Sequence, residues 1–293
     1  MSIQDDVAKS IGAVKTDASA KELTTFKGGG TLKNVFLPKT TREFLRTISA
    51  LYELNVQPFI IGGGSNLIVA DGEIETPAVL TKNLNKARVE NGFAFLECGV
   101  KISDFARLAR EQNLGGLEFL AGVPLTLGGA IRMNASAFSR QIFDFVESVF
   151  VFSTRACYER VCEVKKRDVD YGYRKGADGV IVGAKLKLER VEKSQSLARV
   201  KEYLSIRAER QPRGNTCGSV FKNGEIPSGK LIEKCGLKGL RHGGAEISRK
   251  HANFIVNTGG ATAADFLALV EICERRVYEE FGIKLEREFK VIR

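Results

Sequence analysis

Residues 59–71, FIIGGGSNLIVAD, place three consecutive glycines between two apolar runs. The run before the glycines is typical of a buried strand, and LIV at 67–69 predicts a second strand directly after them. A dinucleotide-binding Rossmann fingerprint would instead continue into a helix and would need a glycine where Leu67 stands. The stretch therefore excludes that fold and predicts a strand, a tight loop and another strand.

The glycine run is a candidate phosphate-binding loop. Glycines after a buried strand expose backbone N–H groups and let a ligand approach closely, although a plain β-turn is an equally reasonable interpretation of one such loop. A second glycine pair, Gly128 and Gly129, is followed by Asn134 and lies about sixty positions further along. Two such loops can bind a pyrophosphate from both sides, so together they favour a flavin dinucleotide over a mononucleotide.

Five helices are predicted from apolar residues at helical spacing, at 40–55, 103–115, 196–211, 228–236 and 262–281. The first begins at a Thr-x-x-Glu capping box, and the last ends at a glycine. The side chains expected to be buried are Phe44, Ile48 and Leu51 in the first, Phe105, Leu108 and Ala109 in the second, Leu197, Val200, Tyr203 and Leu204 in the third, and Phe266, Val270, Cys273 and Val277 in the last.

Strands occupy much of the remaining chain. The dipeptide Asn91-Gly92 between alternating runs predicts a hairpin. Three further strands are expected at 147–153, 157–164 and 180–189, and in the last of these Ala184, Leu186 and Leu188 alternate with charged residues. The mixture of helices and strands predicts an α+β protein.

Composition sets broad limits on the function. The chain has 293 residues, 43% of them hydrophobic, which is long enough for about two domains. Its formal net charge of +10 favours anionic partners such as nucleotides or diphosphates. Six well-separated cysteines without a metal-ligand pattern predict reduced thiols and no metal site, and neither a signal peptide nor a membrane span is evident. We therefore expect a cytoplasmic protein.

Three polar residues stand out, and each has a simpler interpretation. Ser219, in TCGSVFKN at 216–223, is a nucleophile, a proton donor or a turn residue. Arg174 is either a clamp for a carboxylate or a surface arginine, and Glu288 is by its pattern a solvated strand position. Neither histidine has a Ser or Asp partner at a recognisable spacing, so a hydrolase triad is not supported.

Seven segments, in this order and spacing, resemble the UDP-N-acetylenolpyruvoylglucosamine reductase family. They are FIIGGGSNLIVAD, GVPLTLGGAIRMNASAF, YGYR, CGSVFKN, SGKLIEKCGLKG, GGAEISRKHANFIVN and LEREFKVI. The resemblance covers the chain from about Thr24 onward and is closest to the shorter type II branch. Residues 1–20 lie outside it and are expected to form a peripheral helix.

The resemblance implies a fold of the vanillyl-alcohol-oxidase/PCMH type. This fold is α+β, with a two-part FAD-binding domain and a smaller α+β substrate-binding domain. The implied boundaries are 1–78 and 79–194 for the two FAD-binding parts and 195–283 for the substrate domain, with a C-terminal strand at about 284–293 that returns to the first part.

The resemblance also implies a reaction and the residues that carry it. NADPH would reduce a non-covalent FAD, and the reduced flavin would pass hydride to the enolpyruvyl sugar nucleotide. Ser219 would be the general acid, while Arg174 and a protonated Glu288 would stabilise developing charge. The implied cofactor residues are Gly62, Gly63, Gly64, Ser65, Asn66, Gly122, Thr126, Gly128, Gly129 and Asn134. The candidate substrate residues are Tyr173, Arg210 and Asn223.

Three positions depart from the family pattern. Gly224 stands where proline is usual, Glu246 where glutamine is usual, and Arg132 at a normally apolar place. Glu246 raises doubt about a substrate contact there, because an anion would repel a diphosphate. Two alternatives remain open at this point: a flavin oxidase or dehydrogenase of the same fold that acts on another substrate, and a basic nucleic-acid-binding protein. We expect no nucleic-acid partner and no membrane insertion.

Overall fold

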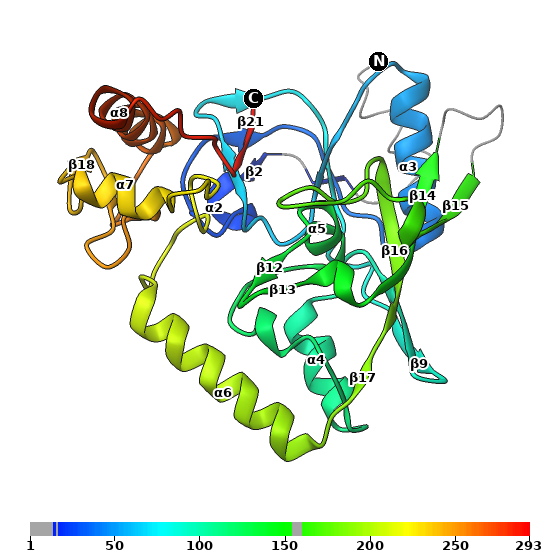
Figure 1. Ribbon diagram of the computed structural model, residues 1–293. Helices are drawn as coiled ribbons and strands as arrows, with labels where there is room; N and C mark the ends of the chain where they lie inside the picture. Colours follow the sequence, from blue (N-terminus) through cyan, green and yellow to red (C-terminus); the bar gives the residue numbers. More distant parts are fainter. Residues whose placement is uncertain (1–13, 16, 154–159) are drawn as a thin grey trace. The chain divides into compact units, whose positions relative to one another are not determined.

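The computed structural model describes residues 14–15, 17–153 and 160–293 (Figure 1). The chain forms two compact units. Unit 1 holds the described residues of 14–15, 36–63 and 78–206, and unit 2 holds those of 17–35, 64–77 and 207–293. The boundary passes through the glycine run, between Gly63 and Gly64. The three-part division implied by the family resemblance stays a prediction.

The main sheet of unit 1 has five antiparallel strands in the order β15-β14-β16-β10-β9 (Figure 1). Their bounds are Ala87–Glu90 for β9, Phe93–Glu97 for β10, Val146–Ser153 for β14, Arg160–Lys165 for β15 and Val180–Lys187 for β16. Phe93 pairs with Glu90, which confirms the hairpin predicted at Asn91-Gly92. Residues 157–159 of one predicted strand lie outside the described residues.

One face of this sheet forms the core of unit 1. Ala94 and Leu96 of β10 and Ala184 and Leu186 of β16 are buried, while Lys187 is exposed. The alternation predicted for Ala184, Leu186 and Leu188 is therefore confirmed, whereas residues 180–183 are all buried. From Ala184 to Leu188 the buried side chains come from every second residue, because neighbouring side chains of a strand point to opposite faces.

A second sheet has the order β1-β4-β8-β5 and shares a hydrophobic core with the helix predicted at 40–55. The strands are Val14–Lys15, Val35–Phe36, Ala78–Leu80 and Phe59–Ile61, and β5 pairs in parallel with β8. Helix α3, Thr41–Glu53, begins where the side chain of Thr40 accepts a hydrogen bond from the amide of Glu43. Phe44, Ile48 and Leu51 are fully buried, as the helical pattern predicts.

The remaining elements of unit 1 are short, apart from α6. They are α4 Ile102–Arg110, β11 Leu114–Gly115, η1 Glu118–Leu120, α5 Leu127–Arg132, β12 Ser136–Ala137, β13 Arg140–Gln141, η2 Ile142–Asp144, η3 Lys166–Asp168 and β17 Glu189–Arg190. Helix α6, Lys193–Arg210, continues into unit 2 and ends before Pro212, as predicted.

Two helix predictions in this part of the chain are partly wrong. Helix α4 ends at Arg110 and not at Gly115, because Asn113 adopts a left-handed conformation with φ 53°. Leu108, expected on its buried face, is 58% exposed. In α6, Leu197 and Leu204 are exposed, contrary to the prediction, and Ser196 is buried. Tyr203 packs inward as predicted, since its ring stacks on Phe138 at 4.4 Å.

Unit 2 contains three small groups of strands. Strands β2 Ala18–Ser19, β3 Thr31–Leu32 and β7 Glu73–Ile74 form one sheet, next to the short helix α2 Ala20–Leu23. Strand β6 Leu67–Val69 pairs in parallel with the last strand, β21 Lys290–Ile292. Strands β18 Arg241–His242, β19 Ala245–Ile247 and β20 Ile255–Asn257 form the third group.

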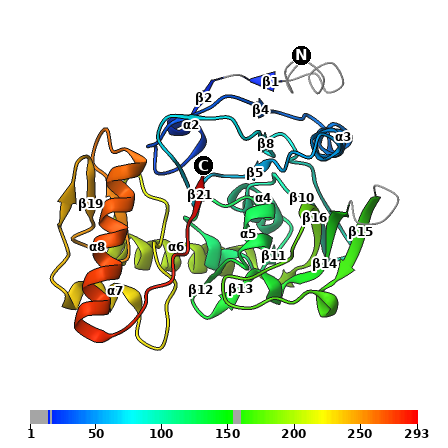
Figure 2. The same cartoon turned by 90° about the horizontal axis from the view of Figure 1, so that it is seen from above.

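The core of unit 2 joins segments from both ends of the chain. The ring of Phe266 lies 5.0 Å from that of Phe26 and 4.9 Å from that of Phe289, both in edge-to-face geometry. Phe266 belongs to α8, Ala263–Phe281, which packs against β19 and against α7, Ser228–Lys234 (Figure 2). The N-terminal and C-terminal segments therefore share one core.

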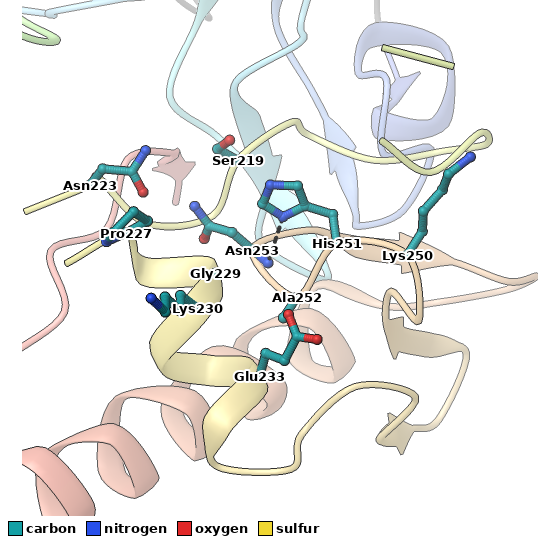
Figure 3. A pocket seen from close by; sticks show the side chains of 10 residues that line it. All are labelled: Ser219, Asn223, Pro227, Gly229, Lys230, Glu233, Lys250, His251, Ala252 and Asn253. Atoms are coloured by element: carbon teal, nitrogen blue, oxygen red, sulfur yellow. Dashed lines mark hydrogen bonds between the residues drawn. The ribbon is translucent and has the colours of Figure 1, made fainter. Parts of the chain in front are cut away.

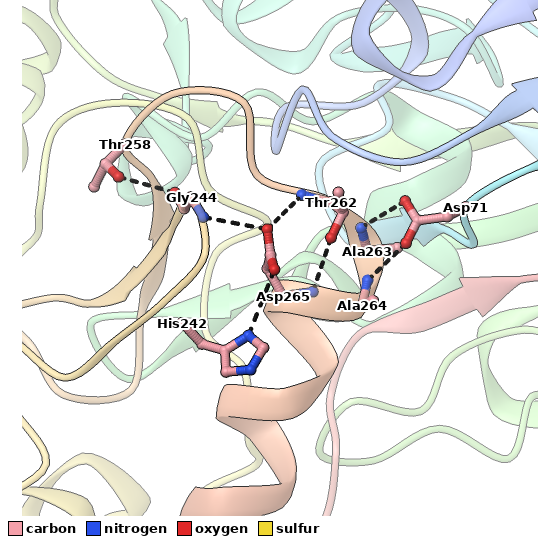
Figure 4. Close-up of polar contacts among 8 residues, drawn as sticks. All are labelled: Asp71, His242, Gly244, Thr258, Thr262, Ala263, Ala264 and Asp265. Atoms are coloured by element: carbon pink, nitrogen blue, oxygen red, sulfur yellow. Dashed lines mark hydrogen bonds and ion pairs between the residues drawn. The ribbon is translucent and has the colours of Figure 1, made fainter.

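Helix α8 confirms its prediction in full. Thr262 and Asp265 form a reciprocal capping box, and Gly282 ends the helix in the left-handed conformation with φ 66°. The expected inward residues are all buried: Phe266, Val270, Cys273 and Val277. Asp71 adds a second cap, because its carboxylate accepts hydrogen bonds from the amides of Ala263 at 2.9 Å and Ala264 at 2.8 Å (Figure 4). Among the described residues, none of the helices has the length and apolar character to span a membrane.

Candidate active site

Ser219 lies in a strand-like segment that is paired on both sides within unit 2. On one side the amide of Val220 donates to the carbonyl of Asn253 at 2.9 Å. On the other side the amide of Glu288 donates to the carbonyl of Val220 at 2.8 Å. Glu288 is therefore paired with Val220 through the backbone, and Ser219 is the residue directly before Val220.

The second half of the glycine run lies against the same segment. Gly218 has φ 83°, and a Cβ on it would lie 3.9 Å from the carbonyl oxygen of Ser65. The side-chain amide of Asn66 donates to the carbonyl of Glu288 at 3.2 Å, and the amide of Lys290 donates to the carbonyl of Asn66 at 3.0 Å. Ser65 and Asn66 are therefore adjacent to the segments that carry Ser219 and Glu288.

Glu288 is buried, with 9% of the residue exposed, so the solvated position expected from its pattern is wrong. The pairing of β21 with β6 draws the end of the chain into unit 2, whereas Glu286 stays on the surface and pairs with Lys222. The thiol of Cys217 lies near this carboxylate. Burial raises the pKa of Cys217 to about 12. Cys217 is therefore a neutral thiol beside Ser219.

A steric constraint explains why position 64 is a glycine. Its φ of 64° is left-handed, and a Cβ there would lie 1.9 Å from the carbonyl oxygen of Leu23. The carbonyl of Gly64 accepts from the amide of Thr25 at 3.1 Å. Only glycine fits this turn without moving the backbone.

In unit 1, the first half of the glycine run meets the second predicted loop. A Cβ on Gly62 would lie 2.2 Å from Oγ1 of Thr126, and one on Gly63 would lie 2.7 Å from the carbonyl oxygen of Pro124. Gly129 is also close, since its Cβ would lie 3.5 Å from the same hydroxyl. Gly128 anchors the loop through its amide, which donates to the carbonyl of Cys98 at 2.8 Å.

Thr126 carries a polar atom that the protein leaves unsatisfied. The residue is 5% exposed, and its hydroxyl has no hydrogen-bond partner among the described residues. A buried hydroxyl without a partner is costly, and it points to a ligand with polar atoms at this place. A hydroxyl beside three glycines fits the pyrophosphate of a flavin dinucleotide, which needs close backbone approach and hydrogen-bond donors.

Two predicted cofactor residues have clear structural roles. Gly122 makes a left-handed turn with φ 80° at the start of the second loop. Asn134 is buried, and its side-chain amide donates to Gln141 at 2.7 Å and to the carbonyl of Gly172 at 2.9 Å. A direct contact of Asn134 with a cofactor stays a prediction.

Arg174 lies in unit 1, in a tight turn closed by the amide of Gly172, which donates to the carbonyl of Lys175 at 2.8 Å. Its φ of 56° is left-handed, an uncommon conformation for an arginine that is often found at functional sites. The guanidinium donates to the hydroxyl of Ser136 at 3.0 Å and lies 5.3 Å from the ring of Tyr173, which is half exposed. The turn therefore holds both predicted residues in defined positions.

A cavity of about 220 Å³ opens beside Ser219 in unit 2 (Figure 3). Its lining includes Ser219, Asn223, Lys230, Glu233, Lys250, His251 and Asn253. The side-chain oxygen of Asn223 accepts from the amide of Ser228 at 3.1 Å at the start of α7. Arg210 is exposed at the end of α6 and does not line this cavity. Its predicted role stays a prediction.

Sequence reasoning missed His251 and Asn253. Asn253 is 2% exposed, and its side chain accepts from the amide of Phe221 at 2.9 Å and donates to the carbonyl of the same residue at 2.8 Å. This bidentate clamp fixes the backbone two residues after Ser219. Both residues lie in the quoted segment SRKHANFIVN, which was the available signal. Local spacing could not link them to Ser219, because the two clamped segments are 32 positions apart.

The three departures leave these groups intact. Glu246 is buried between Arg241 at 2.5 Å and Arg249 at 3.3 Å, which compensate its charge, and it does not line the cavity. Arg132 binds Asp178 and the carbonyl of Ala177 at the end of α5. A Cβ on Gly224 would meet nothing within 4 Å.

Comparisons with known proteins show the family of this chain. Residues 32–155 match the family described as FAD binding domain, and residues 210–292 match the C-terminal domain of UDP-N-acetylenolpyruvoylglucosamine reductase. The reductase of that name from Chloroherpeton thalassium is 37% identical over 96% of this chain and 94% of its own length. This chain belongs to the UDP-N-acetylenolpyruvoylglucosamine reductase family. It is therefore an FAD-dependent oxidoreductase, as the seven segments predict.

Solved structures extend the comparison to the fold. The crystal structure of the reductase from Thermus caldophilus has a TM-score of 0.81 and 32% identity, and the match covers 96% of this chain and 99% of that one. Berberine bridge enzyme from Eschscholzia californica has a TM-score of 0.51 at 15% identity over 66% of this chain and 44% of its own. The second likeness concerns the fold alone, and together they confirm the predicted α+β, FAD-binding class.

Proposed function

We propose that this chain carries out its family's reaction with Ser219, Glu288 and Arg174 as the reacting protein groups. The reaction is the NADPH-dependent reduction of UDP-N-acetylenolpyruvoylglucosamine to UDP-N-acetylmuramate, a step in the synthesis of peptidoglycan precursors. When bound, FAD accepts hydride from NADPH and supplies it to the terminal carbon of the enolpyruvyl ether. The observation that carries the proposal is the backbone pairing of Glu288 with Val220, the residue directly after Ser219, which itself lines a cavity.

Ser219 is the proton donor in this proposal. Hydride addition to the terminal carbon leaves negative charge on the neighbouring carbon and the carboxylate, and a proton must then reach that carbon. Gly218 has no side chain, which leaves room for a substrate beside the serine hydroxyl. The donor needs no histidine base, because Ser219 gives up a proton and forms no covalent bond with the substrate.

Glu288 and Arg174 stabilise the charge that develops on the substrate carboxylate. Glu288 is buried, and a protonated carboxyl there donates a hydrogen bond without placing a second negative charge beside the first. Arg174 supplies a fixed cation, held by its turn and by Ser136. The two residues belong to different units, and their joint action on one substrate is part of the proposal.

The cavity beside Ser219 takes part of the sugar nucleotide. At about 220 Å³ it holds a group of phosphate size and not the whole substrate. Asn223 at its edge contacts the diphosphate in this proposal, while Lys230 adds positive charge. Tyr173 and Arg210 provide further contacts. We place the enzyme in the cytoplasm, and the five described cysteines, which are free thiols, suit a reducing compartment.

Anaerobic spectroscopy of the purified protein tests the proposal. NADPH should bleach the flavin absorbance, and the enolpyruvyl sugar nucleotide should restore it. Ser219→Ala should leave the bleaching step nearly unchanged and slow the recovery by about 10²-fold or more, the usual worth of a general acid. Equal loss in both steps would exclude the proton-donor role. Recovery with another oxidant class, but not with this substrate, would instead favour a different flavin oxidoreductase of the same fold.

A further inference from the structure

A histidine shares the cavity with Ser219. His251 lines that cavity next to Asn253 (Figure 3). Residue spacing alone assigns His251 no role, since it is far from Ser219 along the chain. The fold nevertheless places both residues at one surface.

A hydrogen bond fixes which nitrogen of this imidazole carries the proton. The backbone amide of Asn253 donates to Nδ1 of His251 at 3.2 Å, drawn as the dashed line in Figure 3. A nitrogen that accepts a hydrogen bond holds no proton, so the neutral ring carries its proton on Nε2. The same Asn253 clamps Phe221 through its side chain. One residue therefore orients both the imidazole and the strand of Ser219.

Packing holds the ring in this orientation. A Cβ on Gly229 would lie 2.9 Å from Cε1 of His251 and 3.3 Å from Nδ1, so the absence of a side chain at the start of α7 makes room for the imidazole. The ring of Phe254 meets it in edge-to-face geometry, with centroids 5.0 Å apart. These contacts restrict the orientation of the ring.

The imidazole is uncharged at neutral pH. Burial lowers the pKa of His251, and the nearby charge of Lys238 lowers it further, while Glu233 opposes this. Lys230 and Glu233 of α7 and the adjacent Lys250 also line the cavity. Glu233 is itself paired with Lys238 at 2.6 Å, and Lys250 is bound to the carbonyl of Ala208. The surroundings therefore favour a neutral His251 imidazole over a third positive charge beside Lys230 and Lys250.

We propose that His251 is a substrate-contacting residue that donates its Nε2–H to an oxygen atom of the bound sugar nucleotide. The inference rests on the proposed function and adds a residue to it. A neutral donor in a fixed orientation binds a substrate oxygen without the cost of removing water from a buried charge.

Substitutions that move the donor test this inference. In His251→Gln the side-chain amide nitrogen can take a place near that of Nε2, whereas in His251→Asn it lies nearer to Nδ1. The substrate concentration that half-saturates flavin reoxidation should rise about 10-fold in His251→Asn and His251→Ala, the worth of one lost neutral hydrogen bond, and less than about 3-fold in His251→Gln. Gly229→Ala displaces the ring without removing it, and it should also raise the substrate concentration that half-saturates flavin reoxidation.

His242→Gln is the matched control, because His242 is exposed on β18 and does not line the cavity. It should keep the wild-type substrate dependence. Wild-type dependence in His251→Ala would overturn the inference, and so would equal damage in His251→Gln and His251→Ala, which would indicate a structural need for the imidazole. If the wild-type flavin is reduced by NADPH but is not reoxidised by this substrate, the proposed function itself fails, whichever residue stands at 251.

Discussion

The two units position their candidate residues in different ways. In unit 1, Arg174 takes its place from a turn that closes between Gly172 and Lys175, three positions apart by their numbers. In unit 2, Glu288 takes its place from Val220 and from Asn66, which is 222 residues away. The first arrangement depends on local conformation, and the second exists only when distant segments have paired. This difference decides which residues a sequence pattern can reveal and which substitutions will have large effects.

The largest expected effect separates two glutamates of the same C-terminal segment. Glu288→Gln removes a buried carboxyl group and should slow flavin reoxidation by the enolpyruvyl substrate by about 10²-fold, the usual cost of losing one preorganised donor. Glu286→Gln removes only a surface ion pair with Lys222 and should change that rate less than about 2-fold. Rapid mixing of the reduced enzymes with substrate measures both rates.

The pair of substitutions also tests long-range positioning. If Glu286→Gln slows reoxidation as much as Glu288→Gln, the effect belongs to the pairing of the whole segment and not to the buried carboxyl. Flavin reduction by NADPH serves as the internal reference, because it precedes the step in which these residues act.

A second expected effect concerns the glycine loop of unit 1. Gly62→Ala would place a methyl group 2.2 Å from Oγ1 of Thr126, and the loop must shift to relieve this contact. Overpacking of this kind costs about 1–3 kcal/mol, so FAD should bind about 10-fold more weakly or worse. Titration of the apoprotein with FAD, followed by flavin fluorescence, measures the dissociation constant.

Gly224→Ala is the matched glycine control. A methyl group there meets nothing within 4 Å, and Gly224 is not in the left-handed region. It should bind FAD like the wild type. Equal affinity of Gly62→Ala and Gly224→Ala would show that the glycine run serves the turn alone and that the hydroxyl of Thr126 does not face the cofactor.

Features with a local cause were predictable from the sequence. The capping box at Thr262 and the glycine at 282 fixed the two ends of α8, and Asn91-Gly92 fixed the hairpin between β9 and β10. The family and its cofactor also followed from seven short segments, because the order and spacing of several motifs are far more specific than any single one. The comparisons confirm both.

Features that depend on partners far along the chain were not predictable. Helix α6 has an apolar stripe, but a stripe is buried only where another element covers it, and Leu197 and Leu204 remain exposed. The pattern around Glu288 indicates a solvated strand, but the residue is buried, and its backbone is bound by Val220 and Asn66, which lie far away along the chain. The cavity beside Ser219 likewise has a lining drawn from two distant segments, which the hydrogen bonds between Asn253 and Phe221 join across 32 positions. No local pattern encodes these pairings.

The smallest expected effect compares a local cap with a distant one on the same helix. Thr262 caps α8 from the adjoining position, while Asp71 caps it from 192 residues away and accepts hydrogen bonds from two of its first amides. Thr262→Ala and Asp71→Ala should each lower the free energy of unfolding by about 1 kcal/mol, since each leaves helix amides unsatisfied and Asp71 also interacts favourably with the helix dipole. Urea denaturation followed by circular dichroism gives both values. An unchanged stability in Asp71→Ala would mean that Thr262 alone stabilises the start of α8. The hydrogen bonds from Ala263 and Ala264 to Asp71 would then form without adding to the stability of the fold.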